Sequence, residues 1–188
     1  MIREVIVTSV DRDGNPHLAP MGVHELEGGV KAILPFRPST TLDNLLATRC
    51  AVINCTDDVR VFAGCLTGRR DWPLLPAGQV AGVRLADCLA HTEVELVSVE
   101  DDDIRPRLLC RPLHTAQHAP FPGFNRAQFA VLEAAILVSR LHILPWAKIE
   151  AELDYLRVIH GKTAGPREQE AWNWLMAAIE DFRRGAPE

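Results

Sequence analysis

Hydrophobic residues follow two different periods along this chain, and the change between them falls near residue 120. Before that point, short β-branched and apolar runs are separated by turn residues about every ten positions, which is typical of a barrel or sandwich. After it, apolar residues recur at spacings of three and four, as on the buried face of a helix. Strands followed by a run of helices predict an α+β protein, with a β-domain over residues 1–119 and a C-terminal three-helix part over residues 120–188.

Several segments of the first part have strand character, and one is expected to be helical. The expected strands, in chain order, are 4–10, 17–26, 30–34, 50–55, 59–63 and stretches between 80 and 99. The run Asp11-Arg12-Asp13-Gly14-Asn15-Pro16 predicts a tight reversal after the first strand. Ser39 or Thr40 is expected to cap a short helix that continues through Leu46.

Three helices are expected in the second part. The first, over residues 125–144, is apolar on most sides and has no broad polar face, so something must cover it. The second is expected to begin at Pro145 and to end near Gly161, and the third to begin at Pro166.

Composition and charge narrow the class of protein. The chain has 188 residues, of which 47% are hydrophobic, and 20 basic against 25 acidic residues give a net charge of −5. This balance argues against disorder and against a general nucleic-acid binder. No apolar run is long enough for a membrane span, and the N-terminal residues lack the apolar region of a signal peptide. Five scattered cysteines without a C-x-x-C pair fit reduced thiols, so we expect a cytoplasmic protein without a membrane partner.

Two motifs with possible chemistry do not hold up. The Gly-Lys-Thr run at 161–163 resembles the end of a P-loop, but Leu156 stands where the earlier glycine is required. His114 and His118 have the spacing of metal ligands on a helix, yet prolines flank them and no third ligand is obvious. We therefore interpret them as loop histidines, and the sequence predicts no metal site.

The segment 35–45 combines features that suit a phosphate, and we call it the phosphate segment. A strand ends here, and Arg37, Ser39, Thr40 and Thr41 arrive together at the start of a helix. A guanidinium, hydroxyl groups and free N–H groups at a helix N-terminus are the donors that a dianionic phosphate needs. A helix cap alone, which needs only one of the hydroxyls, explains the segment equally well.

The order of these features resembles the FMN-binding split-barrel superfamily: a strand, an Asp-Gly-x-Pro turn, two more strands, and an Arg-x-Ser-x-Thr segment that opens a helix. The whole chain is similar, more narrowly, to the DUF447 family of flavin-binding proteins. The segments that carry the closer match are Ala19–Val23, Arg37–Leu45, Val52–Asp58, Gly123–Ala127, Glu133–Leu137 and Lys162–Gly165. The resemblance implies a split β-barrel with a C-terminal helical part, a homodimer, and FMN bound at or near the dimer interface.

The resemblance also implies a set of cofactor-binding residues. Those expected to hold the phosphate end are Arg37, Ser39, Thr40, Thr41 and Asn44. Those expected to lie against the isoalloxazine are Met21, Gly22, Val23 and Asn54. No side chain stands out as a general acid or base, so no catalytic residue is named.

Asn125 and Arg126, at the start of the first C-terminal helix, admit two interpretations. Arg126, Glu133 and Arg140 lie two turns apart on one stripe, which is most simply a structural ladder of ion pairs. The alternative is that Asn125 and Arg126 reach the flavin or the substrate.

Three functions stay open at this point. The first is an FMN-dependent oxidoreductase of unknown substrate, with a nicotinamide cofactor as a possible redox partner. The second is a flavin-binding or accessory module without turnover. The third keeps the barrel but uses the pocket for another phosphate-bearing ligand.

Overall fold

The computed structural model describes residues 1–185, and these form two compact units. The barrel unit comprises Met1–Thr56 and Trp72–Phe121, and the helical unit comprises Asp57–Asp71 and the chain from Pro122 onward. Residues 57–71 thus belong to the helical unit although they lie within the expected β-domain. The barrel unit then ends at Phe121, two residues beyond the expected boundary at residue 119. The α+β class and the split β-barrel are both confirmed.

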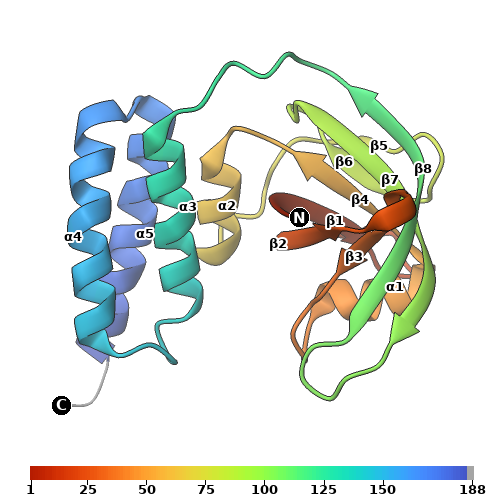
Figure 1. The fold of residues 1–188 in the computed structure, drawn as a ribbon, viewed down its shortest axis with the longest axis horizontal. Helices are drawn as coiled ribbons and strands as arrows, with labels where there is room; N and C mark the ends of the chain where they lie inside the picture. The colour runs from red at the N-terminus through yellow and green to blue at the C-terminus, as the bar shows by residue number, and fades with distance from the viewer. Residues whose placement is uncertain (186–188) are drawn as a thin grey trace. The chain divides into compact units, whose positions relative to one another are not determined.

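Six antiparallel strands close the barrel in the order β1-β2-β3-β8-β7-β4 (Figure 1). Their bounds are β1 Ile2–Val10, β2 Pro16–Glu25, β3 Lys31–Ile33, β4 Cys50–Cys55, β7 Ala90–Glu100 and β8 Arg107–Gln117. The remaining elements of the unit are a short 3-10 turn at Glu27–Gly29, helix α1 (Thr40–Thr48) and a separate hairpin of β5 (Leu74–Pro76) and β6 (Val83–Leu85). The strand β8, which the sequence analysis did not mark, pairs with both β3 and β7.

The turn between β1 and β2 forms as its residues predict. The Asp11 carboxylate accepts the N–H groups of Asp13 and Asn15 at 2.9 and 2.8 Å. These two bonds, with those of the Asn15 side chain and Gly14 N–H, lower the pKa of Asp11. Gly14 has a φ of 84°, a conformation that side chains with a Cβ rarely adopt.

The barrel interior is filled by aliphatic side chains from alternate positions of its strands, as a two-residue period requires. Val5, Val7, Ile33, Leu96 and Leu108 are all at most 2% exposed and belong to one hydrophobic cluster. The same alternation turns the intervening residues outward, so the outer face of β1 and β4 needs a cover of its own. The β5–β6 hairpin provides this cover.

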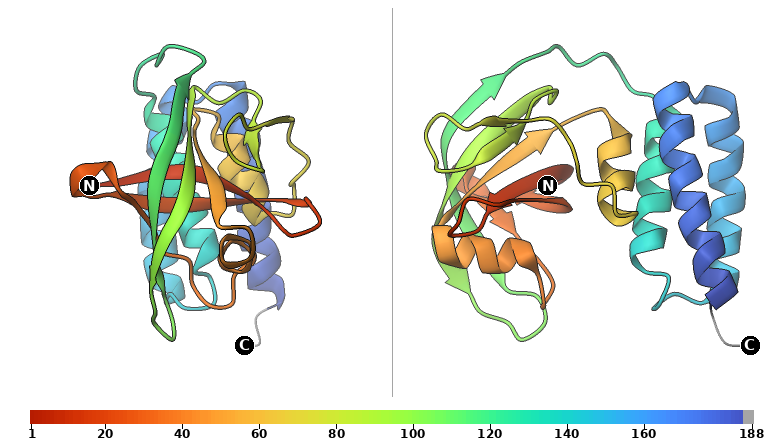
Figure 2. Two further views of the ribbon diagram at one scale, coloured as in Figure 1. Left: turned by 90° about the vertical axis from the view of Figure 1, so that its right-hand side faces the viewer. Right: turned by 180° about the vertical axis from the view of Figure 1, so that it is seen from behind.

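Four helices form the helical unit: α2 (Val59–Leu66), α3 (Arg126–Ser139), α4 (Trp146–Thr163) and α5 (Pro166–Gly185). Figure 2 shows α3, α4 and α5 running side by side. The expectation of a strand at 59–63 is wrong, because this segment lies in α2. Asp58 caps that helix by accepting the N–H of Arg60 at 3.1 Å, and packing against α3 and α5 outweighs the β-propensity of two valines.

The C-terminal helices begin near the expected residues, but two of them end elsewhere. The helix expected over 125–144 ends at Ser139, and the helix expected to end near Gly161 continues to Thr163. Gly161 is therefore inside α4, where the Thr163 hydroxyl donates to the carbonyl of Ile159 at 3.0 Å and keeps the last turn closed. The third helix begins at Pro166, as predicted.

Most apolar residues of α3 are covered within the helical unit itself. Ala130, Ala134 and Leu137 are buried in one cluster with residues of α2, α4 and α5. Neighbouring helices thus provide most of the cover that the sequence leads us to expect, whereas Phe129 of α3 is 46% exposed. None of the helices within residues 1–185 combines the length and the apolar character that crossing a bilayer requires.

Candidate functional site

The phosphate segment of the barrel unit ends in helix α1, and Ser39 caps it. The Ser39 hydroxyl oxygen accepts the N–H of Leu42 at 3.3 Å, and the Ser39 carbonyl accepts the N–H of Asp43. The N–H groups of Thr40 and Thr41 precede this first helical bond, so the helix offers them no carbonyl partner. The cap uses the Ser39 hydroxyl alone. The hydroxyls of Thr40 and Thr41 and the N–H groups of these two residues take no part in it.

Thr41 carries an orphaned polar atom. Its side chain is fully buried, and its hydroxyl oxygen is the one buried side-chain nitrogen or oxygen in residues 1–185 that has no hydrogen-bond partner. A buried hydroxyl without a partner costs about 1–3 kcal/mol. An anionic ligand at the start of α1 would supply an acceptor, so this segment fits the phosphate of a cofactor.

Arg37 joins the phosphate segment to the turn between β7 and β8. Its guanidinium donates to the Asp101 carboxylate at 2.7 Å and to the Asp102 carbonyl at 3.1 Å. Its backbone N–H donates to the carbonyl of Ile104 at 2.9 Å. The side chain keeps 39% exposure and the Asp101 side chain 80%, so this ion pair lies in solvent and can open at little cost.

Arg105, which the sequence analysis did not single out, lies beside the same segment. Its guanidinium donates to the Leu34 carbonyl at 3.0 Å and stacks 4.7 Å over the ring of Phe36. The Asp102 carboxylate accepts the N–H groups of Arg105 and Ile104, which lowers the pKa of that carboxyl and orders the turn. Sixty-eight residues separate Arg105 from Arg37, so only the pairing of β3 with β8 brings them together.

Asn44, the other residue expected at the phosphate end, faces the barrel. It is 5% exposed, and its amide donates to the Ser9 hydroxyl at 3.0 Å. This bond fastens α1 to β1. Asn44 thus orients the helix, and the structure gives no contact by which it approaches the segment's exposed donors.

The strand expected to lie against the isoalloxazine is part of β2. Gly22 pairs with Glu4, and its neighbours Met21 and Val23 turn their side chains into the barrel core. A Cβ added to Gly22 would lie 3.0 Å from Ile2 Cγ2 and 3.3 Å from the Glu4 carboxylate. The Ile2 and Glu4 side chains therefore lie close over the outward side of Gly22.

Asn54 is engaged entirely within the barrel unit. Its amide nitrogen lies 3.0–3.2 Å from the Ile6 and Val52 carbonyls and the Thr8 hydroxyl, and its oxygen accepts the Leu85 N–H at 2.8 Å. The side chain is fully buried, and together with a bond from the Thr8 hydroxyl to the Val83 carbonyl it fastens β6 over β1 and β4. These bonds use both ends of the Asn54 amide within the barrel unit and give no support to the expected flavin contact.

Asn125 and Arg126 lie in the helical unit. The Asn125 side chain caps α3 by accepting the N–H of Ala127 at 2.7 Å. Arg126 is exposed, and among the described residues no ion pair joins it to Glu133 or joins Glu133 to Arg140. The expected ladder is wrong, because Arg126 and Arg140 stand at the two exposed ends of α3.

The two histidines interpreted as loop residues are placed differently. His114 lies within β8, and His118 follows its last residue. The interpretation as a loop pair is therefore wrong for His114. Of the predicted site residues, the structure brings together Arg37, Ser39, Thr40 and Thr41, and this group can bind an anion.

Two family models match the chain. Residues 3–119 match the model described as the N-terminal domain of a protein of unknown function, DUF447, and residues 125–177 match a second DUF447 model. A comparison with curated protein sequences gave no significant match.

Solved structures share the fold. The chain is similar to the FMN-bound protein MM1853 from Methanosarcina mazei, with a TM-score of 0.80, 21% identity and 94% of each chain covered. It is also similar to the 2-nitrobenzoate 2-nitroreductase NbaA of Pseudomonas fluorescens, with a TM-score of 0.54, 17% identity, and 61% of this chain and 64% of that chain covered. A flavin reductase with a split-barrel domain from Shewanella frigidimarina gives a TM-score of 0.53 at 13% identity, with 62% of this chain and 68% of that chain covered.

Proposed function

This chain belongs to the DUF447 family, and from that premise we propose that it binds FMN, with the phosphate held at the start of α1. The observation that carries the proposal is the buried Thr41 hydroxyl, which has no partner among residues 1–185. It stands at the N-terminus of a helix, four residues after an exposed arginine. The FMN bound by the family relative from Methanosarcina mazei supports the choice of ligand.

Each residue of the segment has a separate part in holding the phosphate. The N–H groups of Thr40 and Thr41 and the positive end of the α1 dipole favour an anion there. The Thr41 hydroxyl donates to it and so gains the partner that it lacks. Arg37 turns from Asp101 toward the phosphate, which exchanges one exposed ion pair for a charge-assisted hydrogen bond.

The remaining residues of the site act through position. Asn44 holds α1 against β1, and Ser39 fixes the first turn, so the donors stand ready before the ligand arrives. We place the isoalloxazine along Met21-Gly22-Val23 of β2, where the Ile2 and Glu4 side chains lie close to the outward side of Gly22. Bound FMN supplies one- and two-electron redox chemistry, and the protein supplies orientation.

The finer function that we propose is an FMN-dependent oxidoreductase with a nicotinamide cofactor as electron donor. Support comes from the names of the proteins that share the barrel, which include a nitroreductase and a flavin reductase. A flavin-binding module without turnover is the alternative. A third alternative is another phosphate-bearing ligand in the same place.

Measurements on one preparation of the purified protein distinguish these three functions. The purified protein is expected to be yellow, to show a flavin spectrum, and to release a compound with the mass of FMN on denaturation. A colourless protein that releases another phosphate compound would support the third alternative. Anaerobic bleaching of the flavin by NADH or NADPH, followed by recovery with an added acceptor, supports the oxidoreductase, and a flavin that neither donor reduces supports the binding module.

We also propose a homodimer whose interface contributes to the flavin site. Phe36 and Ile104 are 59% and 67% exposed, and a backbone bond from Arg37 to Ile104 puts both beside the phosphate segment. Apolar side chains exposed next to a ligand site favour a covering partner. Sedimentation across a dilution series is expected to show a dimer that FMN stabilises. A monomer with full FMN affinity at high dilution would contradict it.

A further inference from the structure

Three metal-ligating side chains gather at one end of β7 and β8. Cys88 lies two residues before β7, His91 is the second residue of β7, and His118 directly follows β8. The antiparallel register pairs Ala90 with Gln117, and the His118 N–H extends the ladder by donating to the Leu89 carbonyl at 2.8 Å. This pairing brings His91 and His118, which are 27 residues apart in the sequence, into direct contact.

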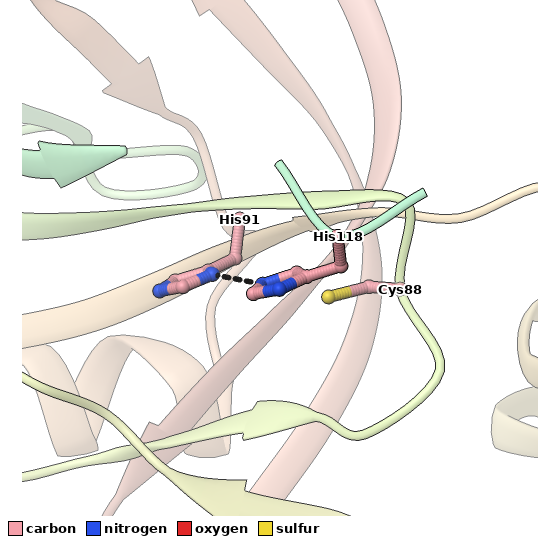
Figure 3. A group of neighbouring side chains, drawn as sticks. All are labelled: Cys88, His91 and His118. Carbon is pink, nitrogen blue, oxygen red and sulfur yellow. Dashed lines mark hydrogen bonds between the residues drawn. The ribbon is translucent and has the colours of Figure 1, made fainter. Parts of the chain in front are cut away.

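The three side chains point toward one another (Figure 3). His91 Nδ1 lies 2.8 Å from His118 Nε2, and the two ring planes are parallel to within 3°, with their centroids 5.0 Å apart. The Cys88 sulfur and the two ring nitrogens all lie within 4.8 Å of one another. Cys88 and His91 are buried, whereas His118 is exposed, so the group is rigid on one side and open to solvent on the other.

A buried carboxylate supports this group from behind. Glu93 is 1% exposed and accepts the N–H groups of Gly78, Gln79 and Val80 at 2.6–2.9 Å. Its Oε1 also lies 3.2 Å from His91 Nε2. A carboxylate can only accept there, so His91 carries its proton on Nε2 and turns an unprotonated Nδ1 toward His118 and Cys88.

This arrangement is the one that metal sites use around their histidine ligands. A ligating histidine nearly always donates its second ring N–H to a carboxylate or carbonyl, which fixes the tautomer and the ring orientation. Glu93 gives His91 that support, and its bonds to the N–H groups of residues 78–80 hold the carboxylate in place.

We propose that Cys88, His91 and His118 form a binding site for a divalent transition-metal ion of the zinc type, with Glu93 as the residue that orients His91. Two imidazole nitrogens and one sulfur are ligands that zinc accepts, and three protein ligands leave a fourth position for water. Two nitrogens on a tetrahedral zinc ion stand about 3.3 Å apart, which is wider than the 2.8 Å seen here. Because Glu93 holds His91, the exposed His118 is the side chain that moves outward.

A neighbouring combination of His91, Glu93 and His114 is the weaker candidate. It also meets the distance criterion, with its three potential ligand atoms within 4.8 Å. Glu93, however, already accepts three backbone N–H groups, and His91 would have to face the ion with the nitrogen that it turns to that carboxylate.

The test is equilibrium dialysis of the chelator-treated full chain against Zn²⁺, with elemental analysis, and the same titration with Co²⁺ followed by absorption. We expect one ion per chain, and a thiolate-to-cobalt charge-transfer band with the visible bands of tetrahedral cobalt. His118→Ala is the main variant, because the side chain is exposed and its loss leaves the barrel intact. It is expected to weaken the affinity for Zn²⁺ by more than tenfold, and Cys88→Ser is expected to abolish the charge-transfer band.

His114→Ala and His142→Ala are the matched controls, since both remove an exposed histidine outside the proposed set. Both are expected to keep the affinity of the unsubstituted chain, and thermal unfolding of all four variants checks that they are folded. Absence of stoichiometric binding in the unsubstituted chain would overturn the proposal and leave a hydrogen-bonded histidine pair. Loss of binding in His114→Ala but not in His118→Ala would also overturn it, by moving the ion to the other combination.

Discussion

The barrel unit and the helical unit bury different kinds of side chain. The barrel unit contains most of the buried polar groups, among them Thr8, Asn44, Asn54, His91 and Glu93, and each of these takes part in a side-chain hydrogen bond. The helical unit packs alanine and aliphatic side chains around Trp172, and His160 and Glu168 are its buried polar residues in the described chain. The chemistry that we propose for this protein lies in the first unit, where polar groups are held rigidly by the fold.

One cysteine in each unit makes the comparison measurable. Burial raises the pKa of Cys65, in α2, to about 11 and that of Cys110, in β8, to about 12. A thiol reacts as the thiolate, so both are protected at neutral pH until their own unit opens. Variants that keep only Cys65 or only Cys110 of the five cysteines therefore report the opening of each unit separately.

The largest effect is expected from Leu175→Ala in the helical unit. Leu175 is fully buried among α2, α3 and α5, and such truncations cost about 2–5 kcal/mol. Labelling of Cys65 should accelerate strongly, while labelling of Cys110 stays slow. The exposed Val158→Ala is the control. Equal acceleration at both thiols would show that the two units unfold together and would remove the distinction drawn here.

Arg37→Ala should leave both units folded and weaken FMN. A charge-assisted hydrogen bond is worth roughly 1.5–3 kcal/mol, which corresponds to more than tenfold in affinity. Fluorescence titration of the apoprotein measures it. Arg111→Ala removes another exposed arginine that pairs with a carboxylate, Glu95, and should change nothing. An Arg37 variant that unfolds would show that the ion pair with Asp101 is structural.

Asn54→Leu should destabilise the barrel unit alone. The leucine removes the acceptor of the buried Leu85 N–H and the donor that serves Ile6, Val52 and Thr8, so we expect a loss of about 1–3 kcal/mol. Cys110 should then label faster than in the unsubstituted chain, and Cys65 should not. Asn173→Leu on the exposed face of α5 is the matched control. Unchanged Cys110 labelling would mean that the β5–β6 hairpin is not fastened by this amide.

The smallest effect is expected from Asp101→Asn. It removes the exposed carboxylate that competes for Arg37, and surface ion pairs contribute about 0–1 kcal/mol. FMN should bind up to about fivefold more tightly, in the direction opposite to Arg37→Ala. Weaker binding would show that Asp101 positions the guanidinium for the ligand instead of competing for it.

The two units also differ in how far the sequence predicts them. The starts of α3, α4 and α5 follow from periodicity and from Pro145 and Pro166, because helical contacts are local. Ser39, one of the two residues expected to cap α1, is the cap, and it follows from local sequence for the same reason. Segment 59–63 was predicted wrongly, since its contacts with α3 and α5 are made with residues far along the chain.

The polar centres of the barrel depend on strand pairing that no local pattern contains. Arg105 reaches Leu34 only because β3 pairs with β8, and His118 reaches Cys88 and His91 only through the register of β7 and β8. A prediction of a hairpin between β7 and β8 would have placed His118 opposite the start of β7, close to Cys88 and His91. These two residues are the further ligands that the sequence pattern of His114 and His118 alone did not indicate.

The central claim is that the phosphate segment of the barrel unit binds the phosphate of FMN. Titration of the apoprotein with FMN and with riboflavin, followed by flavin fluorescence under the same conditions, tests it most directly. The two ligands share the isoalloxazine and the ribityl chain and differ in the phosphate alone. FMN is expected to bind well over tenfold more tightly, and Arg37→Ala should close most of that gap. Equal affinities for the two ligands would contradict the assignment of residues 37–41 to the phosphate.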